Sequence, residues 1–297
     1  MAEQADRLKD WIGQYRQAPQ KTGTPGKQVL ALTSGKGGVG KTHLAVNLSI
    51  MLQARRQRVL LMDADLGMAN AHLLYGAAPA FTLWDVVRGK VSLREAVYRM
   101  DNNVSFIAGG SGIAELAQLS FDEITRIIRG FRDLEREYDW LVIDTGAGIS
   151  TAVLAFVQAA DAVLVVVVPE PSALTDAYGL IKSVWAQGSH PVWKLCVNRV
   201  ANPKQAAMMG HRLVLLTDKA LHQSVELLGL VREDHHVFEA ALRQQPLVQS
   251  FPHSLASQDI GQLADRLLGQ VPVEGSSQGF GGFFSRLASH WGKALKV

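Results

Sequence analysis

One short stretch of the chain has the residue types and spacing of a phosphate-binding loop: Gly35, four further residues, and then Gly40, Lys41 and Thr42. Glycines allow successive backbone N–H groups to point toward an anion, and the N-terminus of a following helix adds its positive dipole end. The lysine can reach the outer phosphates of a nucleotide, and the threonine hydroxyl can bind Mg²⁺. This stretch therefore predicts a nucleotide-binding loop.

The segments on either side of the loop are those that such a loop requires. An apolar run at 29–33 predicts a strand before it, and residues 43–48 follow a helical pattern after it. Further apolar runs predict strands that alternate with helical segments. Because most runs are apolar throughout, we expect an α/β fold with a mostly parallel, twisted sheet and helices on both faces. The runs lie at 59–63, 104–108, 140–144, 162–168, 192–197 and 227–231.

Carboxylates follow two of these predicted strands. The run at 140–144 ends on Asp144, which is the Walker B pattern of a residue that holds Mg²⁺ through water. Asp63 and Asp65 follow the run at 59–63, where they could serve a magnesium ion and an attacking water or form an ordinary acidic loop. Parallel sheets bind ligands at the carboxyl ends of their strands, so we expect these carboxylates near the phosphate-binding loop.

Composition narrows the class of protein further. The chain has 297 residues, a net charge of only +3 and one cysteine, Cys196, so no intramolecular disulfide can form. No apolar signal region begins the sequence, and its longest apolar run is shorter than the roughly 20 residues that span a bilayer. We expect a cytoplasmic protein. The adjacent His235 and His236 are expected to begin a helix and not to bind a metal.

The two ends of the chain differ from its centre. Apolar residues at helical spacing predict a helix over 1–16, and residues 17–28 predict a flexible linker before a main domain at 29–268. A second linker is expected at 269–279. Either the first helix is tethered for a partner or it packs on the domain.

The last segment, 280–297, predicts an amphipathic helix. Apolar residues occupy one face of this helix and cations the other, and no acidic residue occurs after Glu274. This pattern is typical of a helix that binds anionic lipid. A helix docked on its own domain is the alternative. The residues expected to contact the membrane are Phe280, Phe283, Phe284, Leu287 and Trp291.

The loop resembles a known family in one further respect. A second lysine, Lys36, precedes the glycines, and the sequence Lys-Gly-Gly-Val-Gly-Lys-Thr resembles the deviant Walker A loop of the MinD/ParA ATPases, which are P-loop NTPases. The resemblance implies ATP and Mg²⁺ as cofactors and a homodimer in which Lys36 reaches the partner's ATP. It also implies that Asp65 positions the hydrolytic water and that Asp63 supports the metal, beside Thr42 and Asp144.

The same resemblance assigns a nucleotide-contacting set. Gly146 could let its loop approach the γ-phosphate, the segment after residue 168 would border the nucleobase, and an asparagine amide can pair with adenine. The full set is Gly35, Gly37, Gly38, Val39, Gly40, Lys41, Thr42, His43, Gly146, Pro169, Glu170, Asp176, Asn198 and Arg199.

Within that family, residues 63–70, 144–148 and 168–178 resemble the FlhG (FleN, YlxH) regulators of flagellum number. The N-terminal segment, with Gln4 and Leu8, resembles the Asp-Gln-Ala-x-x-Leu-Arg motif through which FlhG proteins stimulate the flagellar GTPase FlhF. The resemblance implies a slow, partner- or membrane-regulated ATPase that lies on the inner face of the cell membrane when ATP is bound. A flagellar transcription activator or C-ring component is a further partner that it suggests.

Two alternatives stay open at this point. The chain could be a MinD-type ATPase of division-site selection, or a ParA-type partition ATPase whose dimer binds DNA. The weak net charge and the amphipathic last helix disfavour the second, so we expect no direct DNA binding.

Overall fold

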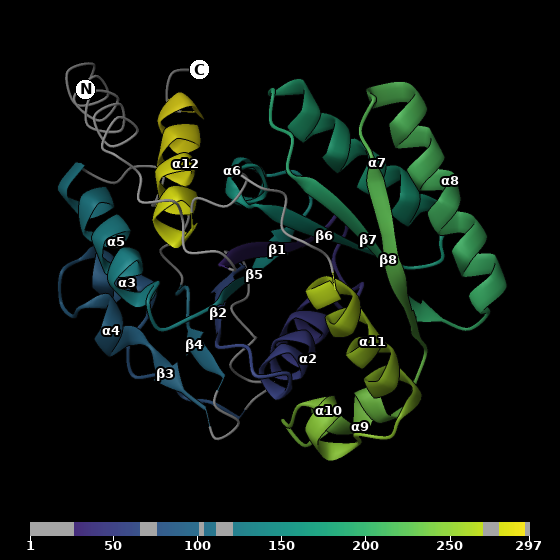
Figure 1. Cartoon of the computed structure of the whole chain (residues 1–297), viewed down its shortest axis with the longest axis horizontal. Helices are drawn as coiled ribbons and strands as arrows, with labels where there is room; N and C mark the ends of the chain where they lie inside the picture. Colours follow the sequence, from purple (N-terminus) through teal and green to yellow (C-terminus); the bar gives the residue numbers. More distant parts are fainter. Residues whose placement is uncertain (1–26, 66–75, 101–103, 111–120, 270–278, 295–297) are drawn as a thin grey trace.

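The computed structural model describes residues 27–65, 76–100, 104–110, 121–269 and 279–294. Within these ranges, strands form one sheet in the order β3-β4-β2-β5-β1-β6-β7-β8 (Figure 1). Only the β3–β4 pair is antiparallel, so the predicted mostly parallel sheet is confirmed. The strands are β1 (Gln28–Ser34), β2 (Val59–Ala64), β3 (Tyr98–Arg99), β4 (Ser105–Ile107), β5 (Trp140–Ala147), β6 (Ala162–Val167), β7 (Val192–Val200) and β8 (Val225–Arg232).

Each predicted strand is present, and the differences lie at their ends. β5 and β7 run three residues past the predicted ends, because Ser34 still pairs with Ala147 and Val200 still pairs with Arg232. Polar residues that serve the site therefore lie on regular strands. The sequence analysis missed β3, which has two residues and is too short for an alternation to be recognised.

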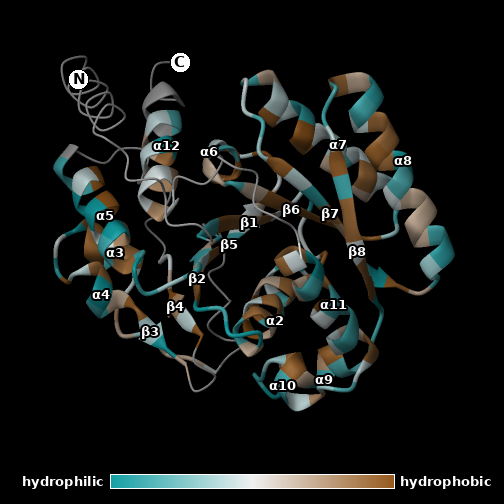
Figure 2. Ribbon diagram, in the orientation of Figure 1, coloured by the Kyte–Doolittle hydropathy of each residue, from teal (hydrophilic) through white to brown (hydrophobic). Residues whose placement is uncertain are grey.

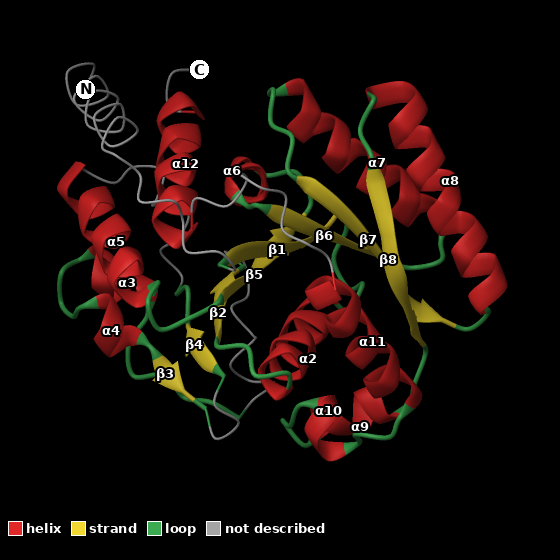
Figure 3. Cartoon of the chain, viewed as in Figure 1, coloured by secondary structure: helices red, strands yellow, loops and turns green. Residues whose placement is uncertain are grey.

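Helices cover both faces of the sheet (Figures 1 and 3). α2 and α11 lie on one face, with α9 and α10 beside them; α5, α12, α6, α7 and α8 follow one another across the other face. The helices are α2 (Lys41–Ala54), α3 (Leu83–Val87), α4 (Leu93–Ala96), α5 (Phe121–Leu134), α6 (Thr151–Ala159), α7 (Pro171–Ala186), α8 (Pro203–Leu221), α9 (His236–Leu242), α10 (Leu247–Ser250), α11 (Leu255–Gly269) and α12 (Gly279–Ala294).

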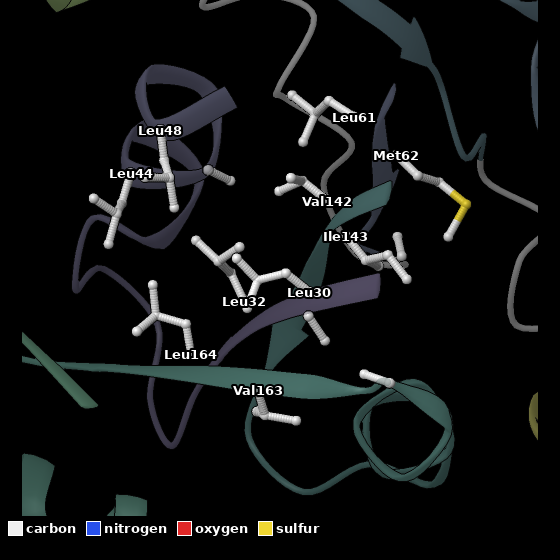
Figure 4. Close-up of a cluster of buried hydrophobic side chains, with 14 of the residues drawn as sticks. Leu30, Leu32, Leu44, Leu48, Leu61, Met62, Val142, Ile143, Val163 and Leu164 are labelled. Atoms are coloured by element: carbon white, nitrogen blue, oxygen red, sulfur yellow. The ribbon is translucent and has the colours of Figure 1, made fainter. Parts of the chain in front are cut away.

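The core centres on β1, the strand that leads into the phosphate-binding loop. Leu30 and Leu32 are fully buried and point toward Leu44 and Leu48 of α2 (Figure 4). Figure 2 shows that β6, β7 and β8 are largely hydrophobic along their length, whereas α8 and α11 carry both kinds of residue. Since burial of a leucine side chain contributes roughly 1.5–3 kcal/mol, this packing fixes the strand and helix between which the loop is suspended.

The last helix, α12, differs from the expected free tail. It fills the place between α5 and α6, and its apolar face, Phe280, Phe283, Phe284 and Leu287, is only 0–4% exposed. The ring of Phe284 stacks on Phe131 of α5, with centroids 3.7 Å apart. In this conformation the α5–α6 surface covers the apolar face, which corresponds to the alternative of a helix docked on its own domain, and membrane binding stays a prediction.

Polar contacts hold the start and the middle of α12. The Arg286 guanidinium donates to the Asp161 carboxylate over 2.8 Å and to the carbonyl of Ala159 over 2.8 Å. Near the start of α12, the Glu135 carboxylate accepts from the backbone N–H groups of Phe280 and Gly281, and burial raises the pKa of Glu135. α12 is thus held by hydrogen bonds as well as by apolar contact.

Other predictions concern residues outside those that the structure describes. These are the predicted first helix with Gln4 and Leu8, most of both linkers, and the side chain of Trp291. Among the residues that are described, no helix combines the length and the hydropathy needed to cross a bilayer.

Candidate active site

The phosphate-binding loop joins the end of β1 to the first turn of α2. Gly38 and Gly40 have φ values of 76° and 85°, in the left-handed region that favours glycine. Gly40 is the N-cap of α2, and no side chain caps this helix end. The first-turn N–H groups are therefore available to an anion, as the sequence predicts.

Lys41 and Asp144 form a buried pair beneath this loop. The Lys41 ammonium lies 2.5 Å from Asp144 Oδ1, and both side chains are at most 7% exposed. Burial raises the pKa of the Asp144 carboxyl, while Lys41 and the Thr42 hydroxyl lower it. Asp144 Oδ2 is buried and has no hydrogen-bond partner. An unsatisfied buried carboxylate oxygen is costly in a native protein, so a bound cation or its water would satisfy this atom.

The other predicted metal residues lie beside this pair. Asp63 on β2 is directly opposite Asp144 on β5 in the parallel register, and the Thr42 hydroxyl is near enough to lower the pKa of Asp144. A hydroxyl and two carboxylates are oxygen ligands of the kind that Mg²⁺ prefers. These residues fit a Mg²⁺ ion that accompanies a nucleotide.

Asp65 lies between the metal residues and the loop that follows β5. Its backbone N–H donates to Asp63 Oδ1 over 3.0 Å. A Cβ added at Gly146 would lie 3.3 Å from the Val153 side chain and at an ordinary contact distance, 3.5 Å, from Asp65 Oδ1, so the Asp65 carboxylate lies beside the end of β5. The carboxylate is thus positioned at the edge of the candidate phosphate site, where the predicted hydrolytic water would lie.

Lys36 contacts its own chain in this structure. Its ammonium pairs with the Glu170 carboxylate and lies 3.4 Å from Ser172 Oγ, at the start of α7. The sequence analysis placed Glu170 near the nucleobase and missed this pair, because 134 positions separate the two residues. Exposed ion pairs contribute about 0–1 kcal/mol, so Lys36 can leave Glu170 at little cost.

The predicted nucleobase residues Asn198 and Arg199 lie near the end of β7 and pack against the phosphate-binding loop. Asn198 Nδ2 donates to the Val39 carbonyl over 2.8 Å, and Arg199 Nη1 donates to the Gly38 carbonyl over 3.2 Å. Burial, and then the charge of Arg199, lower the pKa of His43. The loop and the end of β7 therefore form one continuous wall.

The segment after β6 lies on the other side of the loop. Pro169 and Glu170 connect β6 to α7, and the backbone of Asp176 on α7 is so close to Gly35 that a Cβ at 35 would collide with it. Asp176 thus contributes backbone packing against the loop. Together these contacts bring the predicted residues after β1 and β6 and near the end of β7 to one edge of the sheet.

Comparisons with known proteins agree with this geometry. The family model described as an AAA domain matches residues 27–187. Antiactivator FleN of Pseudomonas aeruginosa is 36% identical over 264 residues, which cover 89% of this chain and 94% of FleN. The flagellum site-determining protein YlxH of Helicobacter pylori is 31% identical over 278 residues, 89% of this chain and 90% of YlxH.

Solved structures give the same result for the fold. The septum site-determining protein MinD of Pyrococcus horikoshii OT3, complexed with Mg-ADP, has a TM-score of 0.65 and 27% identity, covering 82% of this chain and 98% of MinD. The MinC:MinD cell division protein complex of Aquifex aeolicus also gives a TM-score of 0.65 and 27% identity. This match covers 82% of this chain and 96% of the matched chain.

The parallel sheet, the glycine-rich loop and the buried lysine–aspartate pair define a P-loop ATPase with a second lysine at the start of its loop. More narrowly, the chain belongs to the FlhG (FleN, YlxH) group of the MinD/ParA ATPases and hydrolyses ATP.

Replacement of Asp65 by alanine is expected to leave ATP binding within about threefold of wild type and to slow hydrolysis by about 10²–10⁴, the usual contribution of a positioned acid or base. The missing carboxylate would orient water and not phosphate. Single-turnover hydrolysis and equilibrium titration with ATP measure the two quantities. Asp133→Ala, at an exposed position on α5, is the control; a wild-type rate for Asp65→Ala would show that this role is wrong.

Proposed function

We propose that this ATPase is an ATP-controlled dimeric switch that sets the number or position of flagella. The observation that carries the proposal is the similarity to FleN and YlxH over 89% of the chain. One of these relatives is named an antiactivator and the other a flagellum site-determining protein, and the similarity covers 94% and 90% of their lengths, so it extends over nearly the whole of each.

In this proposal the residues of the site act as follows. The bound nucleotide with Mg²⁺ supplies the phosphoryl group that water attacks. Lys41 and the loop N–H groups hold the phosphates, Asp65 orients the water, and Lys36 from the partner balances the charge that develops. Thr42, Asp63 and Asp144 would hold the metal ion. Hydrolysis would be slow until a partner or the membrane completes the site.

The proposed membrane contact must compete with the docked position of α12. Four apolar side chains, each worth roughly 1.5–3 kcal/mol on burial, are already buried against α5 and α6. A bilayer offers these side chains a similar apolar environment, so a single chain gains little free energy when α12 leaves the α5–α6 surface for the membrane. Two tails on one ATP-bound dimer would raise the avidity by about 10²–10⁴, which would make anionic membrane binding depend on ATP.

Two variants separate docking from membrane binding. Glu135→Ala removes the carboxylate that caps α12 and leaves the sequence of α12 unchanged. A larger fraction of molecules should then have α12 undocked and able to bind membrane, and the apparent affinity rises in proportion to that fraction. We therefore expect more than tenfold stronger binding to anionic liposomes in ADP. Phe284→Asp should abolish binding in either nucleotide while dimerisation persists. Co-sedimentation measures both, and Asp133→Ala is the matched control beside Glu135. Unchanged binding by Phe284→Asp would contradict the proposed anchor.

The flagellar role itself is tested through the first segment. We propose that residues 1–16 stimulate an FlhF-type GTPase, with Gln4 and Leu8 on one side of a helix at i, i+4 spacing. A synthetic peptide of these residues should increase GTP turnover by about 10-fold or more, the scale of a residue that orients water or charge in a GTPase. The same peptide with Gln4→Ala is the control. No stimulation by the unaltered peptide would count against the flagellar assignment while leaving the ATPase intact.

A further inference from the structure

Three potential metal ligands meet where β8 ends and α9 begins. Asp234, His235 and His236 each place one ligand atom within 4.8 Å of the other two. Asp234 Oδ1 lies 2.8 Å from His236 Nδ1 and 3.9 Å from His235 Nδ1. None of the three belongs to the Thr42, Asp63 and Asp144 set, so the cluster is distinct from the candidate magnesium site.

The separations match the size of a metal coordination sphere. Zinc bonds to histidine nitrogen and carboxylate oxygen are about 2.0–2.2 Å, which places neighbouring ligand atoms of a tetrahedral site roughly 3.3 Å apart. The two separations from Asp234 Oδ1 fall on either side of that value, so small side-chain rotations would suffice. Two imidazoles and one carboxylate suit zinc and its transition-metal neighbours, whereas Mg²⁺ prefers oxygen ligands alone.

The surroundings of the cluster hold its members in place. Asp234 is nearly buried, and its Oδ2 accepts from the Ala256 backbone N–H at the start of α11. The ring of His236 packs against Phe251, with centroids 4.5 Å apart. Such fixed orientation lowers the cost of gathering ligands around an ion.

His235 has a second carboxylate on its far side. Its Nε2 lies 4.0 Å from Glu239 Oε1, one helical turn along α9. A metal-bound histidine commonly donates its other ring nitrogen to a carboxylate, which fixes the tautomer that leaves the first nitrogen free to bind the ion. Glu239 is placed for that role, with His235 Nδ1 facing Asp234.

A helix start alone accounts for only part of this arrangement. Asp234 Oδ1 accepts from the His236 backbone N–H over 3.0 Å, as a capping residue does. Capping requires no imidazole, yet the side chain of His235, 76% exposed, lies over the ring of His236 with centroids 3.9 Å apart. A hydrogen bond of 2.8 Å to Asp234 Oδ1 orients the His236 ring, whereas His235 Nδ1 lies 3.9 Å from the same oxygen, beyond hydrogen-bonding distance. A cation among the three atoms would replace the proton of the first contact and bridge the second.

We propose that Asp234, His235 and His236 bind one divalent transition-metal ion of the zinc class, with the remaining positions open to water. Glu239 is a positioning residue that acts through His235. The site is next to Glu233, whose N–H donates to the Val200 carbonyl, two residues beyond Asn198. A bound ion therefore stiffens the segment that supports the candidate nucleobase wall.

Competition of the nucleotide-free, full-length chain with a chromophoric zinc chelator, in excess Mg²⁺, tests the proposal. One Zn²⁺ per chain is expected. Glu239→Gln should weaken binding about 10–100-fold, the usual effect of a residue behind a metal ligand, and His235→Ala should weaken it more. His235 is exposed, so its replacement leaves the fold intact, and Co²⁺ absorption reports directly on nitrogen ligation.

His211→Ala, at an exposed histidine on α8, is the matched control and should bind Zn²⁺ as the wild type does. The proposal is overturned if the wild type fails to retain one Zn²⁺ per chain against the chelator. It is equally overturned if His235→Ala retains wild-type affinity, since the ion would then lie elsewhere. Neither result bears on the proposed flagellar switch.

Discussion

Lys36→Ala is expected to abolish ATP-dependent dimerisation and to leave ATP binding by the monomer within about threefold of wild type. In the structure the Lys36 ammonium pairs with Glu170, whereas Asp144 pairs with Lys41, so loss of the Lys36 side chain removes little from the nucleotide pocket of its own chain. A cation supplied across a dimer contributes about 10³–10⁵ in kcat, so hydrolysis should fall on that scale. Analytical ultracentrifugation with ATP and Mg²⁺ measures dimerisation, and equilibrium titration measures binding.

Glu170→Gln is the matched control for this experiment. It breaks the same exposed ion pair but keeps Lys36, so dimerisation should persist. If Lys36→Ala dimerised as the wild type does, the role of Lys36 across the interface would be wrong. Loss of dimerisation in both variants would assign the effect to the ion pair and not to a contact with the partner.

Lys41→Ala has the second large expected effect, and it acts on both binding and stability. Removal of one partner of a buried ion pair leaves an uncompensated charge and costs about 3–5 kcal/mol. The free energy of unfolding should fall by that amount, because the Asp144 carboxylate stays buried. Nucleotide affinity should fall by at least about 100-fold, since roughly two charge-assisted hydrogen bonds are lost.

The double variant Lys41→Ala/Asp144→Asn separates the two effects. With the buried charge removed as well, much of the lost stability should return in urea denaturation, while calorimetry with ADP should still detect no tight binding. Recovery of binding together with stability would mean that Lys41 supports the fold and does not contact phosphate.

The parts of the site that could be predicted are those set by local sequence. Gly35 directly follows β1, which ends at Ser34, and Gly40 is the N-cap of α2, so the loop and its helix are fixed within a few residues. Asp63 and Asp144 lie opposite each other on adjacent parallel strands, and the pairing of those strands brings them together although 81 positions separate them. The pattern of buried strands in the sequence was therefore sufficient to predict both the phosphate-binding loop and the position of these two carboxylates.

The parts that could not be predicted depend on which surfaces meet. Helical periodicity identified the apolar face of α12, but Phe280 and Phe284 look the same in sequence whether a bilayer or α5 covers them. The pair between Lys36 and Glu170 and the capping of α12 by Glu135 are likewise contacts between distant segments. These contacts can be seen only in the folded structure, where the distant segments lie side by side.

The most direct test of the proposed switch is the mass of the protein in solution in each nucleotide state. Light scattering of the full-length protein with Mg²⁺ should give a monomer near 32.3 kDa in ADP and twice that mass with a non-hydrolysable ATP analogue. The expected change follows from Lys36, which is free to exchange Glu170 for a partner's phosphates. The same mass in both nucleotides, whether of monomer or of dimer, would contradict the ATP-controlled switch.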